Sequence, residues 1–182
     1  SRKFQPPPSP YSYVKADVVI EDVSFKNVGI RKKGFLGSQD TERPSLKVKL
    51  DYYEKNRNID GLKNLTFNNN RQDQSLMSQF MGYRIWDEAD SPGSRCAYAK
   101  ITVNGRNLGV YCHVETVREP LLKREFGNDN GTLFEGTVVD FYPEWEGSFE
   151  RKTGDNKKGR EHIVKLINAL QGGSGELFFG GP

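Results

Sequence analysis

The first half of the chain alternates apolar and polar side chains over short runs, a pattern typical of β-strands. Residues 16–34 predict two strands joined by a turn near residues 21–22. A glycine-containing loop follows, and residues 45–51 predict the next strand. Residues 58–67 add another short strand, and the three asparagines at 68–70 mark a polar turn whose amides can satisfy loose backbone groups.

The strand at residues 45–51 has the most regular alternation. Leu46, Val48 and Leu50 fall on one face, because successive side chains of a strand point to opposite sides. Lys47 and Lys49 fall on the other face. The pattern therefore predicts a strand with a buried apolar face and a basic face.

From Ser75 onward the apolar residues take a helical spacing. Ser75 or Asp73 can cap the start of this helix, and Pro92 and Gly93 end it. The expected apolar stripe consists of Leu76, Met77, Phe80, Met81, Tyr83 and Ile85.

The second half of the chain opens with the clearest signal of all. Two alternating runs within residues 97–115 flank Asn104 and Gly105, which predicts a tight β-hairpin. A short helix follows, with Pro120 in its first turn and Gly127 as its stop. The remaining segments are a strand at 132–139, an aromatic and charged surface segment at 140–159, an amphipathic helix at 159–170 and a glycine-rich tail at 171–182.

These elements predict an α+β fold, in which an antiparallel sheet carries one packed helix and a mainly helical region follows. The composition narrows the function classes. The 27 Lys and Arg residues nearly balance the 24 Asp and Glu residues, which argues against a dedicated nucleic-acid-binding protein. No apolar run approaches the roughly 20 residues of a membrane-spanning helix. The N-terminal residues 1–10 read as a proline-rich lead-in.

The chain has two cysteines, Cys96 and Cys112. A disulfide between them is possible in a secreted protein. With strands on either side of the predicted hairpin turn, the expected register places Cys112 nearer to Ala99 than to Cys96. Two free thiols are therefore the favoured expectation.

Five blocks of the sequence, in order, resemble the spore coat protein H (CotH) kinase family, from about Val28 through the last helix. The blocks are VGIRKKGFLGS, RPSLKVKL, GLKNLTFNNNRQDQSLMSQFMGY, YAKITVNGRNLGVYCHVE and LLKREFGNDNGTLFEG. The version found here is most similar to the bacterial secreted or envelope-associated branch. The resemblance implies a protein-kinase-like small lobe at residues 11–118, followed by a partial large lobe at 119–182.

The resemblance also implies a lysine on the phosphate side of a nucleotide. Lys47 is the first candidate, because it lies on a strand before the helix and away from the apolar face; the alternative is a solvated strand lysine. Lys49 shares its face, and Arg31 and Lys33 on a neighbouring strand are weaker candidates. A kinase lysine is normally steadied by a helix glutamate, and here that place holds Gln79.

Two residues on the last strand of the sheet are candidates for the base side of the nucleotide. Tyr111 is expected either to stack on adenine or to serve as a core aromatic residue. Glu115 is expected to anchor the connection between the lobes or, preferably, to cap the helix that starts near Glu119.

The family resemblance implies ATP and Mg²⁺ as cofactors and a secreted or surface protein as substrate. The sequence predicts no dedicated metal site, and its two histidines lack metal-ligand spacing. A kinase-type catalytic loop and metal-binding aspartate are not found, so we expect this chain to be catalytically silent by itself.

Two functions remain open at this point. The first is the N-terminal portion of a CotH-like atypical protein kinase located outside the cell or in the cell envelope. The second is a non-catalytic structural or binding module of a surface, coat or multienzyme assembly, with the aromatic segment at 141–149 as its expected contact surface. Neither reading includes nucleic acid or a membrane span.

Overall fold

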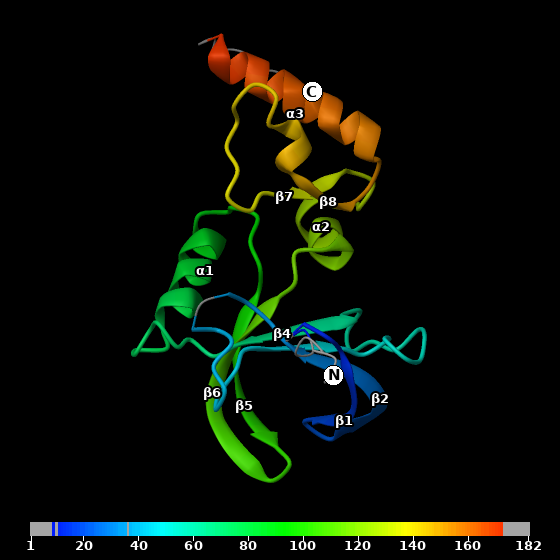
Figure 1. Ribbon diagram of the computed structural model, residues 1–182, viewed down its shortest axis with the longest axis vertical. Coiled ribbons are helices and arrows are strands. Elements are labelled where there is room, and N and C mark those ends of the chain that lie inside the picture. The colour runs from blue at the N-terminus through cyan, green and yellow to red at the C-terminus, as the bar shows by residue number, and fades with distance from the viewer. Residues whose placement is uncertain (1–8, 10, 36, 173–182) are drawn as a thin grey trace, which may run out of the picture. The chain divides into compact units, whose positions relative to one another are not determined.

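The computed structural model describes residues 9, 11–35 and 37–172. The chain forms two compact units, residues 1–117 and 118–182. The predicted lead-in at residues 1–10 and the tail beyond residue 172 lie almost entirely outside the described residues. Figure 1 shows the elements of both units. No helix within the described part of the chain is long and apolar enough to cross a membrane.

The first unit is built on a curled six-stranded sheet, as the sequence predicts in outline (Figure 1). Its strands lie in the order β1-β2-β3-β4-β6-β5, and every neighbouring pair is antiparallel. The α+β fold class is therefore confirmed. The elements are β1 (Val14–Ile20), β2 (Val23–Lys32), β3 (Leu46–Lys49), β4 (Asn64–Asn68), α1 (Ser78–Glu88), β5 (Cys96–Val103) and β6 (Arg106–Glu115).

The turn between β5 and β6 forms where the sequence predicts it. Asn104 and Gly105 have φ values of 49° and 79°. Two successive positive φ angles give the turn the twist that suits a two-residue hairpin, and asparagine followed by glycine is the pair that adopts them most easily.

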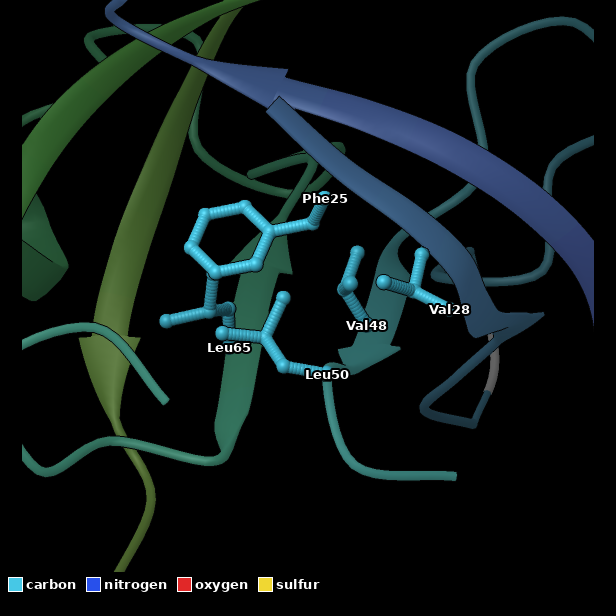
Figure 2. Close-up of a cluster of buried hydrophobic side chains, with 5 residues drawn as sticks. All are labelled: Phe25, Val28, Val48, Leu50 and Leu65. Atoms are coloured by element: carbon cyan, nitrogen blue, oxygen red, sulfur yellow. The ribbon is translucent and has the colours of Figure 1, made fainter. Parts of the chain in front are cut away.

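Strand register divides the sheet into two faces, since directly paired residues of antiparallel strands point to the same side. On one face Arg31 pairs with Lys47, Lys47 with Thr66, Thr66 with Val114, and Val114 with Cys96. We call this the lysine face. The other face, the core face, carries the buried cluster of Phe25, Val28, Val48, Leu50 and Leu65 shown in Figure 2.

The core face is the one that the alternation in β3 predicts. Leu46, Val48 and Leu50 are all buried, with Leu50 completely inaccessible to solvent. Lys47 and Lys49 are only partly exposed and lie on the opposite face. Burial of the apolar side chains drives this choice of face, because a slip of one residue would exchange them with the lysines.

Helix α1 begins at Ser78, slightly later than predicted. The Asp73 carboxylate accepts hydrogen bonds from the backbone N–H groups of Ser75 (3.1 Å) and Ser78 (2.8 Å), which holds the approach to the helix. The hydroxyl of Ser75 lowers the pKa of Asp73, and the N–H of Ser78 lowers it further, because both hydrogen bonds favour the carboxylate.

The packing of α1 differs from the prediction of a buried stripe. No residue of the helix is buried, and Met81 and Ile85 are exposed. Contact with the sheet runs through Phe80, whose ring stacks on Tyr98 of β5 at 5.1 Å between centroids. The Tyr98 hydroxyl donates to the carbonyl of Leu76 at 2.8 Å. Tyr98 pairs with Cys112, so α1 lies against the lysine face.

The second unit contains α2 (Glu119–Phe126), β7 (Leu133–Glu135), β8 (Glu150–Thr153) and α3 (Asn156–Gln171). Helix α2 has proline in its first turn and ends at Gly127 with φ 73°, as predicted. The pairing of β7 with β8 was not predicted. Residues 150–153 read Glu-Arg-Lys-Thr, so this short strand has no apolar alternation by which to recognise it.

The core of the second unit explains much of the aromatic segment at 141–149. Phe149 is buried with Ile163 and Ile167 of α3, and Phe141 packs against them. Tyr142 and Trp145 are the exposed aromatic residues of this segment. Helix α3 begins at Asn156, earlier than predicted, because Asp155 caps it by accepting from the N–H of Lys158 at 2.9 Å.

Candidate functional site

The lysine face gathers four cationic side chains from two neighbouring strands. Arg31 of β2 pairs with Lys47 of β3, and Lys49 lies two residues further on the same face. The hydrogen bonds between these two strands continue one residue beyond the end of β2, where the backbone N–H of Lys33 donates to the carbonyl of Ser45 at 2.9 Å. Arg31, Lys33, Lys47 and Lys49 thus share one side of the sheet, an arrangement that attracts an anion.

Lys33 belongs to a polar chain that reaches α1. Its ammonium donates to the Asn68 side-chain oxygen at 2.7 Å, and the Asn68 amide donates to the Gln79 side-chain oxygen at 2.8 Å. The chain links β2, β4 and the helix. The helix position expected to steady Lys47 therefore reaches Lys33 through Asn68.

The electrostatic state of Lys33 favours an anionic ligand. Burial, and after it the nearby Arg31 guanidinium, lowers the pKa of the Lys33 ammonium below its ordinary value. Both effects penalise the charged form of the lysine. A phosphate next to this group would oppose them, because an adjacent negative charge favours the ammonium.

The loop between β2 and β3 is fixed by a buried asparagine. Asn69 is 2% exposed, and its amide donates to the carbonyls of Arg43 (2.8 Å) and Gly37 (3.2 Å). Its backbone N–H donates to the Ser45 hydroxyl at 2.9 Å. This confirms the expectation that the asparagine run satisfies backbone groups, and it holds the loop beside Lys33.

Arg43 fastens the same loop to β6, and sequence reasoning missed it. Its guanidinium donates to the carbonyls of Leu108 (2.8 Å) and Asn69 (2.8 Å) and also to that of Val110. The guanidinium carbon lies 4.7 Å from the centre of the Tyr111 ring. Nothing in the sequence distinguishes Arg43 from other loop arginines, because its partners are backbone carbonyls distant along the chain.

The placement of Tyr111 favours one of its two expected roles, that of a core aromatic residue. Tyr111 lies on the strand positions shared by His113, which pairs with Phe67, and Glu115, which pairs with Leu65. These are positions of the core face, opposite the lysines. The Tyr111 ring is completely buried, with Arg43 over it. It is a core aromatic residue and is not available to stack on adenine.

Glu115 is engaged within the first unit. It is 3% exposed, and its carboxylate accepts from the backbone N–H of Arg95 at 3.1 Å and from the Arg95 guanidinium at 3.2 Å. A buried carboxylate needs such compensation. Because Glu115 lies on the core face, it does not join the four cations. Its expected cap on α2 stays a prediction, since α2 belongs to the second unit.

Tyrosines surround one end of the cationic cluster, and the sequence analysis did not single them out. The rings of Tyr13 and Tyr52 lie 4.3 Å apart. Arg31 lies over Tyr13 at 5.3 Å, and Lys49 over Tyr52 at 5.9 Å. Gly29 makes this packing possible, because a β-carbon there would lie 2.7 Å from Tyr52. The sequence signal that could have identified these tyrosines is their repetition beside two strands, as YSY at residues 11–13 and YY at 52–53.

The site offers cations but no ready metal centre. Among the described residues, no group of three or more His, Cys, Asp or Glu side chains is placed to hold a metal ion. His113 bonds through Nδ1 to the Thr66 carbonyl at 3.0 Å, and burial lowers its pKa. The described residues therefore offer no cluster that would hold a magnesium ion by protein side chains alone.

Comparison with known proteins gives one family. A model described as CotH kinase protein matches residues 30–178, which is most of the chain. No curated protein matches it. The match includes β2 from Ile30, β3, β4 and α1, and with them all four cations and Gln79. The chain belongs to the CotH kinase family.

Proposed function

We propose that the lysine face of the first unit binds the phosphates of an ATP-type nucleotide. The single observation that supports this most is the convergence of Arg31, Lys33, Lys47 and Lys49 beside the Asn68–Gln79 pair. Phosphoryl transfer depends on positive charge close to the phosphates. Membership of a kinase family makes ATP the natural ligand for such a cluster.

In this proposal each residue of the site has a separate role in nucleotide binding. Lys33 and Lys47 contact the phosphates, while Arg31 and Lys49 extend the positive field towards the tyrosines. Asn68 and Gln79 orient the Lys33 ammonium through hydrogen bonds, without adding charge. ATP supplies the phosphoryl group, and we derive no step through magnesium because the described residues include no group of three or more carboxylate, histidine or cysteine ligands.

On this basis the protein acts as part of an atypical protein kinase that phosphorylates secreted or surface proteins. We place it in the bacterial secreted or envelope-associated branch of the family, with an extracellular or envelope location. We also propose the kinase-like arrangement of a small lobe followed by a large one. These assignments extend the family match and the sequence blocks that carry the resemblance.

One observation favours a non-catalytic alternative. Gln79 occupies the place of the glutamate that steadies a kinase lysine, and its amide carries no charge. A lysine held through neutral amides is oriented less firmly than one in an ion pair. The alternative protein is a nucleotide-binding or structural module of a surface assembly.

Isothermal calorimetry with ATP, in the presence and absence of magnesium, tests the proposal. We expect Lys33→Ala and Lys47→Ala each to weaken ATP binding. Loss of a charged hydrogen bond costs about 1.5–3 kcal/mol, which corresponds to roughly 10–100-fold in affinity. Lys55→Ala, at an exposed lysine outside the four-residue cluster, is the control and should bind like the parent protein.

Two results would overturn the proposal: no heat of binding with ATP, or lysine variants that bind as well as Lys55→Ala does. A second assay separates the two functions. Transfer of labelled phosphate from ATP to a generic protein, abolished in Lys47→Ala, supports the kinase. ATP binding without any transfer supports the module.

A further inference from the structure

The two cysteines of the first unit lie in direct contact. Their sulfur atoms are 2.9 Å apart, and both residues are thiols in the structure. The sequence analysis expected them to be separated by the hairpin register. The observed register explains the difference: Cys96 pairs with Val114 and Cys112 with Tyr98, so the two cysteines are diagonal neighbours on the same face.

Burial and packing limit the access of solvent to this pair of thiols. Cys112 is completely buried and Cys96 is partly buried. Tyr98 lies opposite Cys112 and two residues from Cys96 on β5, and Phe80 of α1 stacks on it. On the other side of β6, Cys112 pairs with Asn68 of β4, the residue that links Lys33 to Gln79. The pair thus lies in the sheet beside the candidate phosphate site.

We propose that Cys96 and Cys112 form an intramolecular disulfide bond when the protein is in an oxidising compartment. A disulfide requires the sulfur atoms to approach to about 2.05 Å, and here they start from 2.9 Å on two hydrogen-bonded strands. The proposal goes beyond nucleotide binding and does not depend on it.

The reaction is thiol–disulfide exchange with a small-molecule disulfide such as oxidised glutathione. One cysteine attacks as a thiolate and forms a mixed disulfide, releasing one glutathione thiol. The second cysteine displaces the other glutathione. The protein gains one S–S bond, loses two S–H bonds and gives up two protons and two electrons, which the two released glutathione thiols carry.

The bond has a defined structural effect. It joins β5, which is the last strand of the sheet, to its neighbour β6. An edge strand is held from one side only, so a covalent link there opposes fraying of the hairpin. The position of Cys112 opposite Asn68 places this added rigidity next to the polar chain that orients Lys33.

In the folded protein the Cys96 thiol exchanges slowly. Burial, and after it the hydrogen bond with Cys112, raises the pKa of Cys96 to about 12. The attacking thiolate is therefore scarce at neutral pH. The disulfide forms fastest when the chain folds in the presence of the oxidant, and once formed it resists reduction in the folded protein.

Peptide mapping tests the bond directly. The protein is unfolded, refolded with oxidised glutathione, blocked with an alkylating reagent under denaturing conditions, and digested with trypsin without reductant. Cleavage at Arg95, Lys100 and Arg106 separates the two cysteines into different peptides. We expect these peptides to be recovered as one linked species, lighter than their sum by two hydrogens, and to separate on reduction.

Cys96→Ser and Cys112→Ser are the control variants, and each should leave one alkylated or glutathione-bound cysteine and no linked peptide. The covalent readout remains valid even if a variant is less stable. Recovery of both cysteines as alkylated thiols, as separate glutathione adducts, or only as links between two chains would overturn the proposal.

Discussion

Replacing Leu50 with alanine is expected to lower the free energy of unfolding of the first unit by about 2–5 kcal/mol. Leu50 is completely buried in the cluster with Val28, Val48 and Leu65 (Figure 2). The substitution removes apolar contacts and leaves a cavity that the rigid sheet cannot fully close. Urea unfolding, read by amide hydrogen exchange in β3 and β4, measures the loss within the correct unit.

Leu170→Ala makes the same chemical change at an exposed position of α3 and serves as the control. It should leave exchange in β3 and β4 unchanged. If the amides of β3 and β4 exchanged as slowly in Leu50→Ala as in the parent protein, the cluster would not be the core of the first unit.

Arg43→Ala is expected to destabilise the first unit by about 2–4 kcal/mol, because each hydrogen bond from a charged donor contributes about 1.5–3 kcal/mol. The guanidinium donates hydrogen bonds to the carbonyls of Leu108, Asn69 and Val110 and lies over the Tyr111 ring. Its loss removes one donor from each of those carbonyls and releases the loop next to Lys33. Arg43→Lys should recover only part of the stability, since an ammonium cannot match the planar fork.

The same measurement on Arg84→Ala gives the comparison. Arg84 is exposed on α1 and pairs with Asp87 and Glu88, so its removal should have little effect. Equal effects of Arg43→Ala and Arg84→Ala would show that the loop does not depend on Arg43. Reduced ATP affinity in Arg43→Ala is expected as a secondary result of loop release.

Local signals in the sequence were sufficient for most elements of the first unit. Asn104 and Gly105 specify their own turn conformation, and the alternation in β3 specifies which of its residues are buried. These patterns depend on neighbours in the chain. The family blocks added the order of the elements around Lys47 and Gln79.

The register between strands that are distant along the chain could not be predicted from local sequence patterns. Tyr111 falls on the core face because β6 pairs with β4 in one register, Leu65 opposite Glu115. A shift of one residue would have placed Tyr111 with the lysines. No local pattern distinguishes the two registers. The contact between Cys96 and Cys112 has a more local cause, the register shift between Ile101 and Thr102 in the β5–β6 pair, which places both cysteines on the same face.

The placement of the four cations on one face agrees with the alternation in the sequence, and their role at a nucleotide stays a prediction. Arg31, Lys33, Lys47 and Lys49 were all singled out and do share a face. Their ranking differs, because Asn68 connects Gln79 to Lys33, and that connection depends on three separate elements meeting. Arg43 and the tyrosines act through contacts that only the folded chain brings together.

The central claim is that ATP phosphates bind at the lysine face. It is tested most directly with an ATP analogue that carries a reactive acyl group on its terminal phosphate and transfers it to a nearby lysine amine. We expect peptide mapping to find the acyl group on Lys33 or Lys47, with labelling suppressed by excess ATP and with Lys55 unlabelled. Labelling that ATP does not suppress, or that falls mainly on lysines of the second unit such as Lys152, would contradict the claim.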